Sequence, residues 1–270
     1  MSVNSYLEKI ANAGVVRGIE KDKIQTSLEN LEYKAFFHFN DSLHDFIVFG
    51  SYKRGTMLPR KMDKNSDVDC MLVFPDDSIR QQSYLDRLKK FVEGSYSRSE
   101  IKQSHPTIVL ELGHIKFELV PAIKVWGGYN IPDRNSILFE WQTVNPEGFA
   151  EDISEINKNS QYQLKPLIRV MKYWNAMRGY PFKSYKLEKQ VMNIVDNECD
   201  YLFNDCETLE DYFYCVVDEL SISMFSSERI KKEVERLRNI VKYIKGFKKR
   251  GDEYTAEKFI AKRIPISTLV

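Results

Sequence analysis

Two acidic residues, two positions apart, stand at the start of an apolar run in the first half of the chain. Asp67 and Asp69 lead into the segment from Cys70 to Phe74, whose composition is typical of a β-strand. Because side chains along a strand alternate between faces, the two carboxylates are expected to lie side by side. Adjacent like charges repel, and a cation between them relieves that repulsion. Carboxylate oxygens suit a hard cation such as Mg²⁺.

A third carboxylate fits this arrangement. Glu118 lies in a strictly alternating segment from His114 to Val120, and Gly113 separates that segment from another strand-like run, Thr107 to Leu112. The two runs predict an antiparallel hairpin with Glu118 on the face opposite the apolar residues. Three carboxylates on neighbouring strands can hold two divalent ions, one for an attacking hydroxyl and one for a triphosphate and its leaving group.

A Gly-Ser turn precedes the acidic pair. Gly50 and Ser51 follow the apolar run Phe46 to Phe49. Backbone N–H groups and a hydroxyl in such a turn can bind phosphate. A phosphate-binding turn upstream of a metal-holding pair predicts chemistry on nucleoside triphosphates. Taken alone, Asp67 and Asp69 also fit an ordinary turn, since Lys-Asn-Ser-Asp at 64–67 is a good turn sequence.

Together these motifs resemble the polymerase β-like nucleotidyltransferases. The pattern is Gly-Ser, then Arg-Gly-Thr at 54–56, Ser-Asp-x-Asp at 66–69, and an acidic residue ahead of Val-Pro-Ala at 120–122. Within that superfamily the chain is most similar to the cGAS/DncV-like nucleotidyltransferases, relatives of cyclic GMP–AMP synthase and 2′-5′-oligoadenylate synthase. The stretch between the two motifs, 56–66, has the length found in these larger synthases. Glu118 departs from the pattern, because the bacterial members usually have Asp there.

The second half of the chain carries the rest of the resemblance. Apolar residues at helical spacing predict a helix over 164–177 that Gly179 ends. Lys165, Arg169 and Lys172 share another face of this helix, which suits either a triphosphate or an ordinary solvated surface.

The resemblance assigns roles to three residues in this region. It implies that Lys172 contacts the triphosphate, that Ser184 hydrogen-bonds it, and that Tyr185 stacks on the base. Stacking on an aromatic ring tolerates any base, so base preference does not follow from Tyr185. On its own, Tyr185 suits a packing role equally well.

The resemblance implies an α+β fold of two lobes. Residues 1–150 would form the nucleotidyltransferase catalytic lobe, with a mixed sheet and an N-terminal spine helix near 19–37. Residues 151–270 would form a helical, oligoadenylate synthase-like lobe. Further expectations are helices over 84–92 and 230–244, a polar crossover over 145–160 and an extended segment over 263–267.

The composition of the chain limits the kinds of partner and the cell compartment that are expected. Lys and Arg total 40 against 39 acidic residues, a net charge of +1, so no overall basic field attracts long nucleic acid. The sequence contains no run of 18 apolar residues, so no membrane-spanning helix is predicted. The first 14 residues lack the apolar core of a signal peptide, so we expect a cytoplasmic protein. The four cysteines lack metal-site spacing, which favours free thiols over zinc ligands.

The activity that the resemblance implies is nucleotidyl transfer with Mg²⁺ or Mn²⁺, held by Asp67, Asp69 and Glu118. The implied products are cyclic di- or oligonucleotide second messengers that act on a downstream effector in bacterial anti-phage defence (CBASS), with a regulatory protein as a further partner. The alternatives are a toxin that modifies tRNA or protein, a synthase of linear oligonucleotides, and a nucleotide-binding pseudo-enzyme. The intact carboxylates argue against the last.

Overall fold

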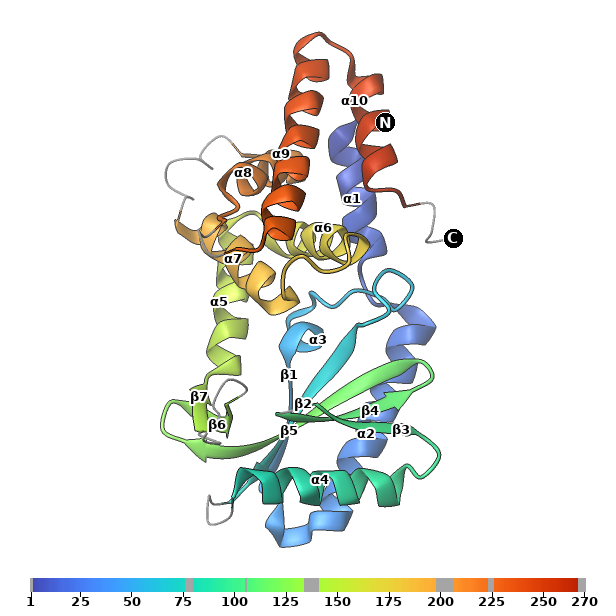
Figure 1. Ribbon diagram of the computed structural model, residues 1–270, viewed down its shortest axis with the longest axis vertical. Helices are drawn as coiled ribbons and strands as arrows, with labels where there is room; N and C mark the ends of the chain where they lie inside the picture. The colour runs from blue at the N-terminus through green and yellow to red at the C-terminus, as the bar shows by residue number, and fades with distance from the viewer. Residues whose placement is uncertain are drawn as a thin grey trace. The chain divides into compact units, whose positions relative to one another are not determined.

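The computed structural model describes residues 2–75, 80–104, 106–133, 141–197, 206–222 and 226–266. Helices and one seven-stranded mixed sheet make up the fold (Figure 1), as the α+β expectation requires. Contacts divide the chain into two compact units. We call them the sheet unit, Val16–Arg60 with Asn65–Glu151, and the helical unit, Met1–Val15 with Lys61–Lys64 and Asp152–Val270.

The division departs from the predicted boundaries at the N-terminus. The first helix, α1 (Val3–Ala13), belongs to the helical unit. Its buried residues, which include Val3, Leu7 and Ile10, pack against α6 (Leu164–Met177), α8 (Leu209–Glu219) and α10 (Glu253–Arg263). The sequence places these partners more than 150 residues away, and the local pattern of α1 does not reveal them.

The sheet unit is built on five strands in the order β1-β2-β5-β4-β3, with β6 beside β5 and β7 beside β6. The pairing of β2 with β5 is parallel and the others are antiparallel. The predicted hairpin is confirmed as β4 and β5, with Leu112 opposite Ile115. The strands are β1 (Asp45–Phe49), β2 (Asp67–Phe74), β3 (Glu100–Ser104), β4 (Thr107–Leu112), β5 (Ile115–Val125), β6 (Gly128–Pro132) and β7 (Trp141–Val144).

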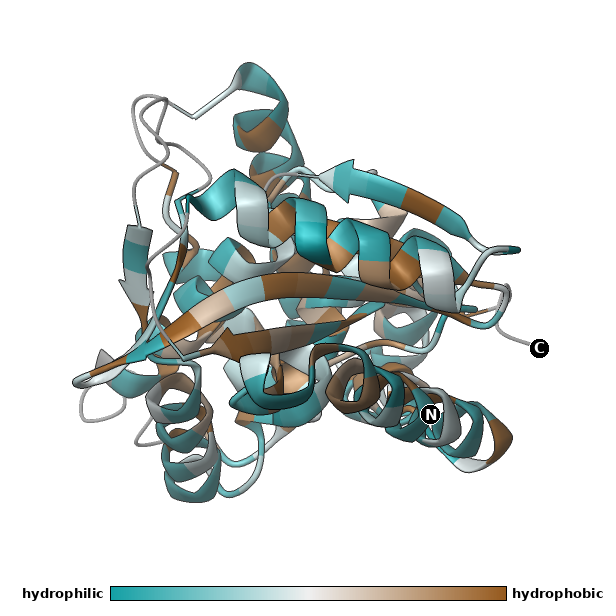
Figure 2. Cartoon of the chain, turned by 90° about the horizontal axis from the view of Figure 1, so that it is seen from below, coloured by the Kyte–Doolittle hydropathy of each residue, from teal (hydrophilic) through white to brown (hydrophobic). Residues whose placement is uncertain are grey.

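Alternation along the two central strands separates the core from the acidic face. On β2, Val68, Cys70, Leu72 and Phe74 join a core formed with α2 (Gly18–Phe39) and α4 (Gln81–Ser95). On β5, the corresponding residues are Ile115, Phe117, Leu119 and Ile123. The central strands are largely hydrophobic, whereas the helices carry much of the polar surface (Figure 2).

The opposite face of the sheet is acidic at the start of β2 and apolar further along the strands. Met71 and Val73 of β2 and Val120 and Ala122 of β5 form a smaller apolar cluster there with Tyr129. Because side chains two apart share a face, Asp67 and Asp69 lie on this same face, at the start of β2. The acidic residues therefore continue an apolar surface on the side of the sheet that α2 and α4 do not cover.

The predicted helices near 19–37 and 84–92 are confirmed as α2 and α4. The segment expected as a polar crossover, 145–160, contains the division between the two units, and it is helical, because α5 spans Pro146–Asn159. Pro is favourable in the first turn of a helix, and Ile153, Ile156 and Asn157 form a buried stripe at helical spacing. This short stripe within a mainly polar segment was the signal for the helix.

The helical unit holds α6, α7 (Ser184–Asn197), α8, α9 (Glu228–Lys249) and α10. The predicted helix over 230–244 is confirmed as part of α9, which continues through Gly246. The extended segment predicted over 263–267 is partly wrong, because Arg263 ends α10 and only 264–266 are non-helical; residue 267 lies outside the described residues. Across the described ranges, no helix combines the length and apolar character needed to cross a bilayer.

One buried side chain helps to hold the connection between α6 and α7. Asn175 accepts a hydrogen bond from the Phe182 N–H and donates one to the Phe182 carbonyl, each at 3.0 Å. Asn175 is fully buried. A buried amide that satisfies both backbone groups of one residue fixes the path of the loop that leads into α7.

Replacing Asn175 with Ala should destabilise the protein. Two backbone groups at Phe182 would lose their partners, so we expect the free energy of unfolding to fall by about 2–4 kcal/mol. Urea titration followed by circular dichroism measures this change. Asn239→Ala is the matched control, because Asn239 is exposed and its amide donates to Glu235 one turn away. Equal losses in the two variants would contradict the role of Asn175.

Candidate active site

The register of β2 and β5 brings the predicted carboxylates together. Asp69 is the Cα partner of Glu118, and Asp67 is the partner of Lys116. Asp67, Asp69, Lys116 and Glu118 are all half-buried, whereas Val68 and Phe117 between them are fully buried. The three carboxylates therefore line one face of two adjacent strands, as the sequence predicted.

Gly50 lies against one of these carboxylates. It follows the last residue of β1, Phe49, which pairs with Asp69, and it opens the short helix α3 (Gly50–Arg54). Its φ of +67° is a conformation that other residues adopt at a cost. A Cβ on Gly50 would collide with the carboxylate of Asp69, lying 2.7 Å from its Cγ and 3.0 Å from its Cβ. The glycine is therefore needed for the position of Asp69 as well as for the turn.

The turn that begins at Gly50 is closed by its own backbone. The Ser51 carbonyl accepts hydrogen bonds from the N–H groups of Thr56, at 2.9 Å, and Met57, at 3.0 Å. Gly55, at φ +72°, caps α3 in the left-handed conformation. The buried Arg54 guanidinium lies over the ring of Phe149, 4.8 Å from its centroid. Gly50 and Ser51 are thus carried on a turn anchored next to the acidic pair.

Lys116 also lies in the acidic site, although the sequence motifs did not single it out. Its Nζ lies 3.0 Å from Asp67 Oδ2 and 3.0 Å from Glu118 Oε1. Burial would lower the pKa of Lys116, but the charges of Asp67 and Glu118 outweigh it and raise that pKa above its ordinary value. The lysine therefore stays charged between two of the three carboxylates. Strand alternation alone already placed it on the face of Glu118.

The chemistry of this site fits a divalent ion, although its oxygens are not gathered around one point. In the described part of the chain, no three acidic, histidine or cysteine side chains form a complete metal-binding group. What favours Mg²⁺ or Mn²⁺ is the donor set, three carboxylates aligned on adjacent strands.

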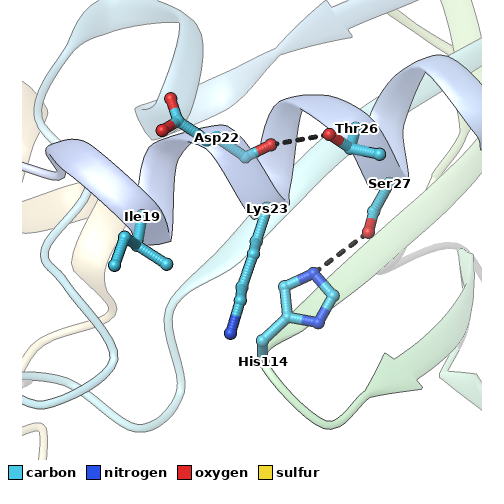
Figure 3. A pocket seen from close by; sticks show the side chains of 6 residues that line it. All are labelled: Ile19, Asp22, Lys23, Thr26, Ser27 and His114. Carbon is cyan, nitrogen blue, oxygen red and sulfur yellow. Dashed lines mark hydrogen bonds between the residues drawn. The ribbon is translucent and has the colours of Figure 1, made fainter.

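The start of β5 is tied to α2 at a shallow pocket of about 440 Å³ (Figure 3). Ser27 of α2 and His114, in the turn before β5, share a hydrogen bond of 3.0 Å between Oγ and Nε2. The other lining residues, Ile19, Asp22, Lys23 and Thr26, are on the same helix. This contact helps to fix the hairpin turn two residues before Lys116.

The remaining predicted site residues belong to the helical unit. Lys172 is buried on α6, with its Nζ 4.0 Å from Glu188 Oε2 on α7. Arg169 of α6 donates from Nε to the Ala11 carbonyl at 3.0 Å, so part of the predicted basic face joins α6 to α1. A contact between Lys172 and phosphate stays a prediction.

Ser184 and Tyr185 form the first turn of α7. Ser184 is half-buried, whereas 54% of Tyr185 is exposed. An exposed aromatic ring at the start of a helix is accessible to a base, so the geometry within this unit is compatible with the roles that the resemblance implies.

The cysteines within the described ranges are free thiols. Cys70 lies on the core face of β2, and its burial together with the charge of Asp69 raises the pKa of its thiol. Cys206 and Cys215 are also free thiols, with their sulfur atoms 3.6 Å apart, and Cys199 lies outside the described residues.

Replacing Gly50 with Ala should disrupt the acidic site while the fold survives. The new methyl group must push Asp69 away, so we expect binding of Mn²⁺ to weaken at least about tenfold, because a misplaced carboxylate no longer shares the ion. Calorimetric titration measures this loss. Gly55→Ala is the matched control: it has the same left-handed strain, at about 1–2 kcal/mol, but no atom lies within 4 Å of the place its methyl group would take. Equal metal binding in both variants would contradict this role of Gly50.

Two curated proteins that are similar to this chain are cyclic nucleotide synthases by name. A probable cyclic nucleotide synthase of Bacillus cereus is 27% identical, over 57% of this chain and 56% of the relative. A cyclic AMP-AMP-AMP synthase of an Acinetobacter species is 29% identical, over 49% of this chain and 39% of the relative. The chain thus matches little more than half of one curated relative and less than half of the other.

The fold also matches a solved structure along its length. A mutant di-nucleotide cyclase from Vibrio superposes with a TM-score of 0.75, covering 98% of this chain and 96% of the other at 11% identity. At this identity the similarity establishes the fold alone. Residues 1–157 match the model of the SMODS family, described as the Second Messenger Oligonucleotide or Dinucleotide Synthetase domain. Because that match covers more than half of the 270 residues, the chain belongs to the SMODS family of cGAS/DncV-like nucleotidyltransferases.

Proposed function

We propose that this protein is a metal-dependent nucleotidyltransferase that makes cyclic di- or oligonucleotide second messengers from nucleoside triphosphates. The observation that carries the proposal is the alignment of Asp69 with Glu118, beside Asp67 and against Gly50. Membership of the SMODS family and the cyclic nucleotide synthases among its relatives support the same activity.

In the proposed reaction, a ribose hydroxyl of one nucleotide attacks the α-phosphorus of a nucleoside triphosphate. A new phosphorus–oxygen bond forms, the bond to the β-phosphate oxygen breaks, and pyrophosphate leaves with the electron pair. The hydroxyl proton is released to solvent. A second transfer between the joined nucleotides, or a later one, closes the ring.

In this proposal, residues of the sheet unit bind the metal ions and the phosphates. Asp67, Asp69 and Glu118 would hold Mg²⁺ or Mn²⁺, which lowers the pKa of the attacking hydroxyl and neutralises the phosphates. Gly50 and Ser51 bind phosphate oxygens through backbone N–H groups and the serine hydroxyl. Catalysis by such a site rests mainly on positioning and on charge stabilisation.

The residues of the helical unit bind the nucleotide. We propose that Lys172 and Ser184 contact the triphosphate and that Tyr185 stacks on the base. Glu188 Oε2 lies 4.0 Å from the Lys172 ammonium and would hold it on one side while phosphate binds on the other. Lysine has three donors, so both contacts are possible at once.

Membership of the family supports a proposal for the wider role of the protein. We propose that the product activates a downstream effector in bacterial anti-phage defence (CBASS), that synthesis takes place in the cytoplasm, and that a regulatory protein governs it. The near-neutral net charge of +1 favours small nucleotides over long nucleic acid as substrates.

The first test is product formation by the purified protein. Labelled ribonucleoside triphosphates with Mg²⁺ or Mn²⁺ should give a small phosphatase-resistant product. Asp67→Asn and Asp69→Asn should each reduce its rate more than about 100-fold, because even supporting residues of a metal site contribute up to that amount. Asp86→Asn, at an exposed carboxylate of α4, is the control and should keep full activity.

Other outcomes of the same assay identify the alternatives. A product that nuclease digests from a free end would indicate a linear oligonucleotide synthase. Label transferred only to added tRNA or protein would replace the proposed function with that of a modifying toxin. No metal-dependent incorporation under any of these conditions, including with added cell extract as a source of the regulatory protein, would exclude the enzyme.

Replacing Tyr185 should weaken nucleotide binding. Loss of stacking in Tyr185→Ala should raise KM about 5- to 150-fold, equivalent to about 1–3 kcal/mol, while Tyr185→Phe keeps the ring and stays near the wild type. Steady-state kinetics with each triphosphate measures the effect. Tyr243→Ala removes a similarly exposed ring from α9 and serves as the control. An unchanged KM in Tyr185→Ala would rule out stacking.

A further inference from the structure

Lys116 occupies the position that two carboxylates of the acidic site share. Its ammonium bridges Asp67 on β2 and Glu118 on its own strand, at 3.0 Å from each. The parallel register favours the contact, because Lys116 is the Cα partner of Asp67 and precedes Glu118 by two residues on the same face. Backbone pairing therefore delivers a positive charge into the acidic cluster.

A third acidic residue near Lys116 is paired with another cation. The antiparallel neighbour of Lys116 on β4 is Glu111, which would be the ordinary cross-strand partner. Arg60 contacts Glu111 instead, with 3.0 Å between guanidinium nitrogen and carboxylate oxygen. The Arg60 backbone N–H in turn donates to Glu20 of α2 at 2.9 Å. The competing acid is thus paired with a different cation.

Partial burial makes the charge of Lys116 effective. The side chain of the lysine is 20% exposed and those of its two partners are each 28% exposed, so water screens these charges less than it does on an open surface. Asp67, Asp69 and Glu118 together carry three negative charges within two adjacent strands. Without a cation, their repulsion would oppose the pairing of β2 with β5.

We propose that Lys116 is a positioning residue that acts as the internal counter-ion of Asp67 and Glu118, holding these two carboxylates of the acidic site together before a divalent ion binds and yielding part of this contact when it does. The proposal rests on the metal site of the proposed function. Lysine and the divalent ion compete for the same oxygens, so the residue stabilises the metal-free protein and also weakens metal binding.

This competition gives two effects of opposite sign for one substitution. Lys116→Met keeps a long unbranched side chain but removes the charge. Without metal, the repelling carboxylates should lower the Tm by about 2–4 °C or more. With metal, the ion meets no positive charge, so Mn²⁺ should bind about tenfold more tightly. A merely structural lysine would lower the Tm without tightening the binding of metal.

The experiment uses the full chain without nucleotide. Binding of Mn²⁺ is followed by electron paramagnetic resonance of the free ion, and the Tm is measured in EDTA and in excess Mg²⁺. Lys116→Met and Lys116→Gln remove the charge, whereas Lys116→Arg retains it and should stay near the wild type in both measurements. Lys102→Met is the matched control, because Lys102 pairs with Glu100 on the exposed strand β3.

In both neutral variants, and in neither Lys116→Arg nor Lys102→Met, we expect a lower Tm in EDTA and a larger gain in Tm on adding Mg²⁺. The same two variants should show a lower Kd for Mn²⁺. Unchanged or weaker binding of Mn²⁺ in the neutral variants would overturn the proposal. So would failure of both to fold even in excess Mg²⁺, since the lysine would then be needed for packing. None of these measurements requires turnover, so an inactive protein that responds as expected would refute the proposed enzyme but not the counter-ion.

Discussion

The parallel pairing of β2 with β5 is the constraint on which the site depends. It is the parallel junction in an otherwise antiparallel set of described strand pairs, and its register sets Asp69 opposite Glu118. A shift by one residue would turn every side chain of a strand to the other face, moving the carboxylates into the core beside α2 and α4. The buried residues that alternate with the acids, Val68 and Phe117 among them, make that shift costly. Packing of the core thus determines where the chemistry takes place.

Within this register, two residues adjust the acidic side chains. Gly50 gives Asp69 its space by lacking a Cβ, and Lys116 supplies a charge between Asp67 and Glu118. One acts by steric exclusion and the other by electrostatic attraction. Both act on the carboxylates before any ligand is present, so the site is partly organised in the free protein. Pre-organisation of this kind lowers the cost of assembling the site when substrate binds.

The parts of the structure that the sequence predicted are those that depend on local pattern. The faces of Asp67, Asp69 and Glu118 follow from alternation, the β4–β5 hairpin from Gly113 between two apolar runs, and α2 from its helical period. The features that the sequence did not predict depend on contacts between residues far apart in the chain. The Lys116–Asp67 contact needs the register of two strands almost fifty residues apart, and α1 packs against helices from the other end of the chain. α5 was overlooked because only one stripe of a mainly polar segment is buried.

The most direct test is a crystal structure of the protein with Mn²⁺ and a triphosphate whose α–β bridge cannot be cleaved, with manganese located by its anomalous scattering. We predict an anomalous peak bound by oxygens of Asp67, Asp69 and Glu118 and of the triphosphate, with Lys116 turned from at least one of its two carboxylates. Manganese bound elsewhere, with Asp67 and Glu118 still held by the lysine and the nucleotide absent from Gly50 and Ser51, would contradict this prediction.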